Sequence, residues 1–175
     1  AQVPASMIHD ILRMGHEMLN HPIYLLPGVA ESLPQLAETY KLILITKGDL
    51  LHQEQKLAQS GLKDFFSEVH IVSEKQTDTY STIFGTDVQI SAMVGNSIKS
   101  DIVPALNAGA TAIHIPARYE WDMEQATEPA SNPRFLKAVG FENVQELLTK
   151  IWQKKGKVYK KTKCSTQKQT SYQLS

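Results

Sequence analysis

Residues 91–116 read SAMVGNSIKSDIVPALNAGATAIHIP, and this stretch decides the fold class. The apolar run at residues 90–94 ends at a Gly-Asn-Ser turn, and Asp101 follows Asn96 by five residues. A helix rich in small residues comes next, and a second apolar run at residues 111–115 closes the unit. The order of strand, loop, helix and strand predicts an α/β fold with a parallel sheet and right-handed crossovers.

The loop after residue 94 is a candidate site. In open parallel sheets, ligands bind at the carboxyl ends of the strands. A site of that kind would be faced by Gly95, Asn96, Ser97 and Asp101. The alternative is a turn in which Gly, Asn and Ser serve only the backbone geometry, with Asp101 as an acid in the first turn of a helix. This stretch alone leaves both interpretations open.

A second predicted strand also ends in polar residues. Residues 41–45, KLILI, run directly into Thr46, Lys47, Gly48 and Asp49. A hydroxyl group and backbone N–H groups at a strand end can together hold an anion. The simpler explanation is a helix that Asp49 caps, which needs no ligand.

A third predicted strand, EVHIV at residues 68–72, is followed by Lys75. A lone Lys in such a loop is more often a solvated surface residue than part of a site. Beside an anion site it would instead supply a positive charge at the same edge of the sheet.

The remaining segments alternate between helix and strand or lack a clear pattern. Apolar residues on one face predict amphipathic helices at residues 7–19, 29–40 and 141–152. Further helices are predicted at residues 50–61, with Gly61 as the stop, and at residues 79–84. Residues 117–133 are irregular and could be a lid over the site, although a packed surface excursion is the simpler interpretation.

Charge is distributed unevenly along the 175 residues, although the 18 basic and 18 acidic residues cancel formally. Residues 154–175 hold seven Lys and no acid, which leaves a globular part with an excess of acid. The tail has almost no large apolar side chains, so we predict that it is disordered and solvated. No fold motif or aromatic series supports nucleic-acid binding by this tail.

The sequence has few features that indicate a cellular compartment. Residues 1–6 have neither the charged nor the apolar region of a signal peptide, and no apolar run approaches a membrane span. Cys164 is the single cysteine, which excludes an internal disulfide and a cysteine-rich metal site. From these features we predict a cytoplasmic protein without a membrane partner.

Three motifs in order resemble those of the haloacid dehalogenase-like hydrolase superfamily, over about residues 25–152. ILITKGD at residues 43–49 is similar to the second motif of that family, a Ser or Thr that ends a strand. SEKQTDTY at residues 73–80 is similar to the third, a Lys at a helix start, and residues 93–109 are similar to the fourth, the acidic metal loop. The resemblance implies a doubly wound, Rossmann-like parallel sheet.

The resemblance also implies phosphoryl transfer, in which a protein mainly positions the phosphate and neutralises its charge. Thr46 and Lys75 would be catalytic: the Thr46 hydroxyl would donate to a phosphoryl oxygen, and Lys75 would place its charge between the phosphate and the attacking carboxylate. Lys47 and Gly48 would add phosphate contacts. Asp101 and Asn96 would bind Mg²⁺, which prefers oxygen ligands.

The sequence departs from the family pattern at two points. Asn96 stands where the family more commonly has Asp, which lowers the negative charge of the metal loop. The nucleophile of the family is the first Asp of a DxDxT or DxDxS motif that closes the first strand, and no Asp-x-Asp occurs in this chain. We therefore expect a product truncated at the N-terminus, and we expect the chain alone to be inactive.

This truncation predicts a particular domain organisation. Residues 1–24 would be the remnant of a helical cap, residues 25–152 the α/β core, and residues 153–175 the basic tail. The family's first strand lies between the strands of the second and fourth motifs, so its loss would leave two central strands without a shared neighbour. We expect self-association through those unpaired strands.

The resemblance favours a Mg²⁺-dependent phosphatase that acts on a small phosphorylated metabolite through an aspartyl-phosphate intermediate. An alternative is a non-catalytic domain of the same fold that binds a phosphate ligand or a partner chain. A third option is a 2-haloacid dehalogenase, because Lys75 and an anion pocket could also serve a carboxylate substrate.

Overall fold

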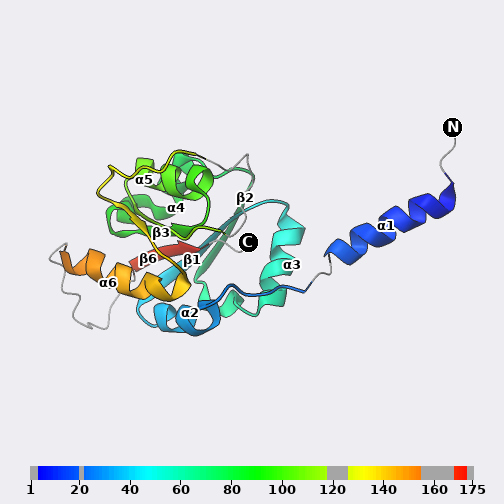
Figure 1. Cartoon of the computed structure of the whole chain (residues 1–175), viewed down its shortest axis with the longest axis horizontal. Coiled ribbons are helices and arrows are strands. Elements are labelled where there is room, and N and C mark those ends of the chain that lie inside the picture. Colours follow the sequence, from blue (N-terminus) through cyan, green and yellow to red (C-terminus); the bar gives the residue numbers. More distant parts are fainter. Residues whose placement is uncertain (1–3, 20–21, 118–125, 155–167, 173–175) are drawn as a thin grey trace.

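The computed structural model describes residues 4–19, 22–117, 126–154 and 168–172. Within these residues, six strands form one sheet in the order β2-β1-β6-β3-β4-β5. All of its strand pairs are parallel. Helices lie on both faces of the sheet (Figure 1). The predicted doubly wound α/β fold is therefore confirmed.

The strands are short and separated mostly by helices, as a parallel sheet requires. They are β1 (Tyr40–Lys47), β2 (Glu68–Val72), β3 (Ala92–Gly95), β4 (Thr111–His114), β5 (Phe135–Lys137) and β6 (Lys168–Tyr172). The α-helices are α1 (Ala5–Leu19), α2 (Val29–Ala37), α3 (Leu50–Ser60), α4 (Thr77–Phe84), α5 (Val103–Ala108) and α6 (Val144–Lys154). The short 3-10 helices are η1 (Lys63–Phe65), η2 (Gly85–Ile90) and η5 (Phe141–Asn143), and η3 (Ile98–Ile102) is a π-helical turn.

Alternate side chains of β1 are buried on opposite faces of the sheet. Leu42 joins the core beneath α2 and α6, where Leu36 and Trp152 are also buried. Ile43 and Ile45 join the core beneath α4 and α5. A strand covered on both faces reads as a continuous apolar run, which explains why KLILI is recognisable in the sequence.

Helix α3 begins and ends at the residues that the sequence indicates. Asp49 is its N-cap and accepts a hydrogen bond from the N–H of His52 at 2.9 Å. Gly61 is its C-cap, with a φ of 69°, which only glycine adopts without strain. Asp49 therefore does cap a helix, as the simpler interpretation of this loop proposed.

The centre of the sheet differs from the prediction. Residues 168–172 of the basic tail form β6, which pairs with β1 on one side and with β3 on the other. At these residues the expectation of a disordered tail is wrong, and the expected gap between β1 and β3 is filled. The rest of the tail, residues 155–167 and 173–175, lies outside the described residues.

Strand β6 is held unequally by its two neighbours. It aligns with β1 over five residue pairs and with β3 over only two, Ala92 with Thr170 and Met93 with Ser171. Its sequence, Lys-Gln-Thr-Ser-Tyr, has no aliphatic residue, although central strands are usually apolar. β6 is therefore recognisable as a strand from its backbone pairing in the structure and not from an apolar pattern in its sequence.

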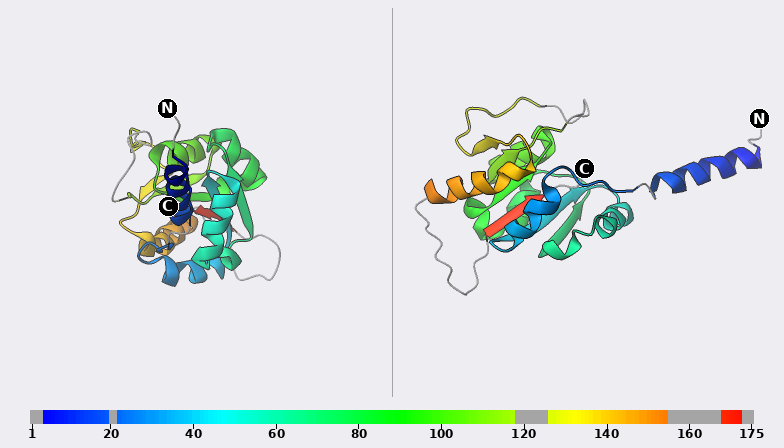
Figure 2. Two further views of the ribbon diagram at one scale, coloured as in Figure 1. Left: turned by 90° about the vertical axis from the view of Figure 1, so that its right-hand side faces the viewer. Right: turned by 60° about the horizontal axis from the view of Figure 1, so that its bottom comes forward.

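Helix α1 projects away from the other described elements, as Figure 1 and the right-hand view of Figure 2 show. It matches the amphipathic helix predicted at residues 7–19. Its apolar side chains are exposed, among them Ile11 at 62% and Leu12 at 67%. Its assignment to a helical cap stays a prediction. No helix within the described residues is long and apolar enough to cross a membrane.

The irregular segment before β5 is described only in part. Residues 118–125, where the sequence suggested a lid or a surface excursion, lie outside the described residues. β5 follows at the edge of the sheet and pairs with β4. The sequence analysis did not predict this strand.

Candidate active site

The predicted site residues come from the carboxyl ends of three strands of one sheet. Thr46 lies at the end of β1, Lys75 follows β2, and Asn96 follows β3. Leu42 and Ala92 both align with Thr170 of β6, and the same register carried forward places Thr46 level with Asn96. Because neighbouring strands lie about 4.8 Å apart, two strand positions separate Thr46 from Asn96 by about 10 Å. The strand between β1 and β3 is β6, which the structure describes as far as Tyr172.

Lys75 and Asp101 form a buried ion pair. The ammonium nitrogen of Lys75 lies 2.8 Å from Oδ1 of Asp101, and both side chains are fully inaccessible to solvent. Lys75 is therefore not the solvated surface residue that a lone Lys in a loop would usually be. Charges buried at this depth are paired because isolated ones are very costly to desolvate. The pair places one positive and one negative charge beneath the strand ends.

The turn after β3 is built around the carboxylate of Asp101. The N–H of Ser97 donates to Oδ2 of Asp101 at 3.0 Å, and the Ser97 hydroxyl accepts from the N–H of Ser100 at 2.9 Å. A π-helical turn, η3, follows at once and carries Asp101. Turns of this type are frequent at functional sites. Asp101 is thus both a first-turn acid and a buried side chain at the strand end.

Gly95 lets the Asp101 carboxylate approach the backbone. A Cβ atom at Gly95 would lie 2.4 Å from Oδ2 of Asp101 and 2.5 Å from its Cγ, far below ordinary contact. The Asp101 carboxylate therefore packs directly on the Gly95 backbone. A side chain at Gly95 would have to displace Asp101 and the ion pair with Lys75.

The Thr46 hydroxyl is directed by a residue that the sequence analysis did not single out. Thr46 is 2% exposed, and its hydroxyl donates to Oε1 of Gln53 on α3 at 3.1 Å. The side-chain amide of Gln53 in turn donates to the carbonyl of Lys47 at 3.3 Å. Gln53 thereby ties α3 to the end of β1. No spacing or motif distinguishes it from the other polar residues of α3.

Lys47 and Gly48 have partners inside the chain. The Lys47 ammonium lies 3.8 Å from a carboxylate oxygen of Glu74, and about a third of the Lys47 side chain is exposed. The N–H of Gly48 donates to the carbonyl of Val72 at 3.2 Å. In this conformation the Gly48 N–H joins two strand ends, so an anion would have to compete for it.

Asn96 is held from the neighbouring strand end. Nε2 of His114, the last residue of β4, lies 2.9 Å from the backbone carbonyl of Asn96. A carbonyl only accepts, so Nε2 carries the proton in this contact. His114 is 4% exposed, and it is a second residue that the sequence analysis missed. The one feature of the sequence that could have pointed to His114 was its position at the end of a predicted strand.

Tyr80 supports the acidic turn from α4. Its hydroxyl donates to the carbonyl of Ser100 at 2.9 Å, and the ring is fully buried. Burial, and then the negative charge of Asp101, raise the pKa of Tyr80 far above its usual value. The phenol therefore stays protonated and keeps donating to the turn that carries Asp101.

The oxygen donors around the turn are a small set for a metal. No group of three or more His, Cys, Asp and Glu residues gathers within the described part of the chain. Asp101 already accepts from Lys75 and from the Ser97 N–H, while Asn96 is partly exposed. Magnesium sites often use one or two carboxylates together with substrate phosphate and waters. The residues present therefore fit Mg²⁺ only as part of a site that a phosphate completes.

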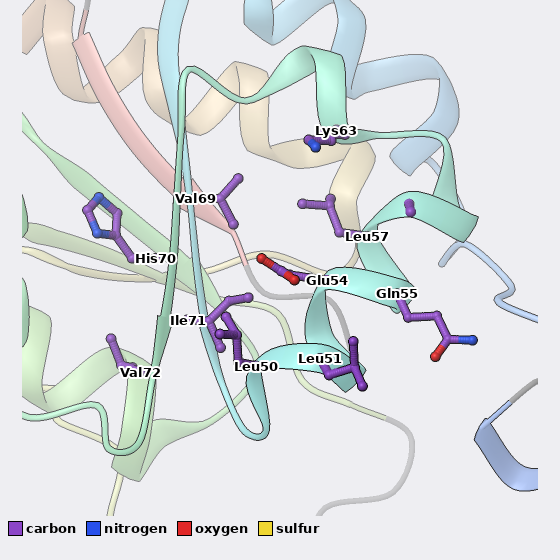
Figure 3. Close-up of a pocket in the computed structure, with 11 residues that line it drawn as sticks. Leu50, Leu51, Glu54, Gln55, Leu57, Lys63, Val69, His70, Ile71 and Val72 are labelled. Atoms are coloured by element: carbon purple, nitrogen blue, oxygen red, sulfur yellow. The ribbon is translucent and has the colours of Figure 1, made fainter. Parts of the chain in front are cut away.

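Two cavities lie near the strand ends. The larger, about 790 Å³, opens between α3 and β2 and is lined by side chains such as Leu50, Leu51 and Val69 (Figure 3). It contains none of the predicted site residues. The smaller, about 450 Å³, is lined in part by Gly95 and Asn96. Of these two cavities, the smaller one borders the turn that carries the candidate site.

Comparison with known proteins identifies relatives of the same fold. No family model matches the chain. The pyrimidine 5'-nucleotidase PynA of Streptococcus pneumoniae (strain ATCC BAA-255 / R6) is 33% identical over 98 residues, which are 50% of this chain and 41% of that protein. The chain thus spans less than half the length of this curated relative.

Solved structures extend the likeness over most of the chain. The structure of a haloacid dehalogenase-like family hydrolase from Xanthomonas campestris has 33% sequence identity and a TM-score of 0.77, and the match covers 89% of this chain and 67% of that one. The HAD-hydrolase YfnB from Bacillus subtilis, described as bound to magnesium, has 20% identity and a TM-score of 0.59, with 71% and 56% of the two chains covered. The second likeness is evidence for the fold alone.

These findings agree with the three motifs at the strand ends. A third of the aligned residues are identical in the Xanthomonas hydrolase and in this chain, and the match covers two thirds of that hydrolase. The strand of the second motif, β1, and the strand of the fourth, β3, are separated by one strand position, which β6 fills here. The chain belongs to the haloacid dehalogenase-like hydrolase family.

Proposed function

We propose that this chain carries the phosphate- and metal-binding half of a Mg²⁺-dependent phosphatase that acts on a small phosphorylated metabolite. The observation that carries the proposal is the buried pair of Lys75 and Asp101, whose atoms lie 2.8 Å apart beneath the end of β3. An ion pair of this kind is costly to bury, and its position below a strand-end anion site gives it a chemical use.

The residues of this chain would bind and orient the phosphate. Thr46 would turn its hydroxyl from Gln53 to a phosphoryl oxygen, and the 3.1 Å hydrogen bond holds that hydroxyl at the strand end beforehand. Lys75 would stabilise the negative charge that develops during phosphoryl transfer. Gln53 and Tyr80 would keep α3 and the acidic turn in place.

Asp101 and Asn96 would hold Mg²⁺, which when bound would supply Lewis-acid stabilisation of the phosphoryl oxygens. His114 would fix the Asn96 backbone through the 2.9 Å contact at its carbonyl. The hydrogen bonds of Asp101 with Lys75 and with the Ser97 N–H fix the position of the carboxylate at the turn after β3 before any metal binds.

The nucleophile is the part that this sequence does not contain. An aspartyl-phosphate intermediate needs a carboxylate in line with the phosphorus, and no Asp-x-Asp motif occurs in the 175 residues. We therefore propose that the chain alone binds phosphate without turning over a phosphate ester.

A non-catalytic phosphate-binding domain is the second candidate. It is favoured by the engagement of both Asp101 oxygens within the chain, at 2.8 and 3.0 Å, which leaves few donors for a metal. Such a domain would bind phosphate through Thr46 and Lys75 without needing Mg²⁺.

Isothermal titration of the chain with inorganic phosphate, with and without Mg²⁺, distinguishes the two. The phosphatase proposal predicts that Mg²⁺ tightens phosphate binding by about tenfold or more, because the metal adds a charge at the phosphate. Phosphate binding that is indifferent to Mg²⁺ favours the non-catalytic domain. Hydrolysis of 4-nitrophenyl phosphate by the chain, lost in Asp101→Ala, would contradict the predicted inactivity.

A further inference from the structure

The smaller cavity lies against the candidate site and is walled mainly by apolar side chains. Its floor is made by buried or partly buried residues of the core, including Val94, Ile115 and Phe141. Residues 23–27, which lead into α2, form another wall and contribute Leu26. Its volume of about 450 Å³ lies within the usual range of small-molecule pockets.

The polar groups of the cavity are few and nearly balance in charge. They come from Tyr24, from Lys56 on α3, from Asn96 just after β3 and from Glu142. The Glu142 carboxylate is seated against glycine: a Cβ atom at Gly140 would lie 2.5 Å from its oxygens. One cation and one anion do not make an anion site, so the cavity does not suit a phosphate group itself.

We propose that this cavity binds the organic group of the substrate, and that the group is an aromatic ring. The inference rests on the proposed phosphatase function, in which the phosphate lies over Thr46 and Lys75. Asn96 borders the cavity and follows β3 at the edge of the sheet where Thr46 lies near the end of β1, so an ester whose phosphate binds at that edge has the cavity beside it. The substrate class is then an aryl or heteroaryl phosphate ester.

Size and chemistry both favour a ring over a sugar phosphate. Small-molecule pockets are roughly 300–1,000 Å³ and mostly apolar with a few placed polar groups, as here. A polyhydroxylated group would leave most of its hydroxyls against Val94, Ile115 and Phe141 without hydrogen-bond partners, which is costly. A planar ring gains affinity by burying apolar surface there.

The test compares two phosphate monoesters, 1-naphthyl phosphate and glycerol 3-phosphate, by isothermal titration of the full chain with Mg²⁺. We expect 1-naphthyl phosphate to bind about tenfold more tightly. Leu26→Asp should remove most of that preference, because it places a charge in the apolar wall. Leu26 is 55% exposed, so the substitution spares the core. The matched control is Leu51→Asp, at a 73% exposed Leu of the larger cavity, which should keep the preference.

Equal affinities for the two esters, or equal effects of the two Asp variants, would overturn the inference and leave the phosphate site intact. If neither ester binds, the proposed function itself fails. Should Leu26→Asp not fold, methyl NMR of the unmodified chain decides the matter. The methyl groups of Val94 and Ile115 should then shift on addition of 1-naphthyl phosphate but not of glycerol 3-phosphate, and shifts confined to other methyls would contradict the inference.

Discussion

Lys75 Nζ lies 2.8 Å from Asp101 Oδ1, and neither side chain is accessible to solvent. The two residues follow different strands and are separated by 26 positions in the chain. Their pairing links the loop after β2 to the turn after β3, so it is a structural contact as well as a candidate catalytic one. Its removal should therefore affect stability in a protein without any ligand.

Lys75→Met should lower the free energy of unfolding by about 3–5 kcal/mol, because it leaves the Asp101 carboxylate buried without its partner. Urea denaturation followed by circular dichroism measures the change. The matched control is Lys47→Met, which breaks a partly exposed pair with Glu74 and should cost below about 1 kcal/mol. Equal losses in the two variants would show that the buried pair has no special structural role.

Gly95→Ala should destabilise the turn that carries Asp101, because the new Cβ would lie 2.4 Å from a carboxylate oxygen. The expected loss is about 1–3 kcal/mol, as for other overpacked sites. Gly15→Ala in α1 is the control, since nothing lies within 4 Å of a Cβ there. Thermal denaturation compares the two. A midpoint for Gly95→Ala as high as that for Gly15→Ala would contradict the close packing.

The pH dependence of stability should include a contribution from Glu68. Its hydrogen bond with Lys41, and then the one with His70, hold the pKa of Glu68 below the reference value of 4.5. A depressed pKa stabilises the fold above the unfolded-state value, and that stabilisation is lost as the pH falls through the folded-state value.

Glu68→Gln should therefore be less stable than the unmodified chain at neutral pH, by at most about 1 kcal/mol because the pair is partly exposed. The difference should shrink as the pH falls below 4.5. Urea midpoints measured from neutral to acidic pH test this, and Lys41→Met should show the same dependence. A difference in stability that stays constant across that pH range would show that ionisation of Glu68 does not contribute to the pH dependence.

Strand β6 should protect the amides of β1 and β3 from exchange with solvent. Thr170 aligns with Leu42 on one side and with Ala92 on the other, so Thr170→Pro removes an N–H at the centre of the sheet. Hydrogen exchange of β1 and β3 should then be faster, and the chain should aggregate more readily. Thr170→Val keeps the N–H and should leave exchange unchanged. Slow exchange in both variants would mean that β6 is not needed there.

The sequence predicted β1, β3 and β4 because their apolar runs are buried, on both faces in the case of β1, as Leu42 and Ile43 illustrate. It predicted the edge strand β2 from a short β-branched run. It did not predict β5 or β6. β5 is only three residues long, and β6 has a polar sequence without the alternation that marks a strand. Both are specified by backbone pairing with neighbours distant in the chain, which no local pattern encodes.

The candidate site was predicted through its strand ends, where Thr46, Lys75, Asn96 and Asp101 do lie. The contacts between them could not be read from the sequence. Gln53 reaches Thr46 from α3, and only the position of that helix beside β1 makes the contact possible. The same residues are compatible with a Lys75 in solvent and with a Lys75 paired to Asp101. Which of the two occurs depends on how α4 and α5 pack.

Phosphate binding at Thr46 tests the central claim most directly. Titration of the chain with inorganic phosphate and Mg²⁺, followed by ³¹P NMR, should give saturable binding in the unmodified chain. Thr46→Val removes the hydroxyl with little change of shape and should weaken that binding by about tenfold, the value of one lost hydrogen bond to a charged group. Thr149→Val, which removes an exposed hydroxyl on α6, should bind phosphate as the unmodified chain does. Equal phosphate affinities in all three proteins would contradict the account, because the anion would then lie elsewhere.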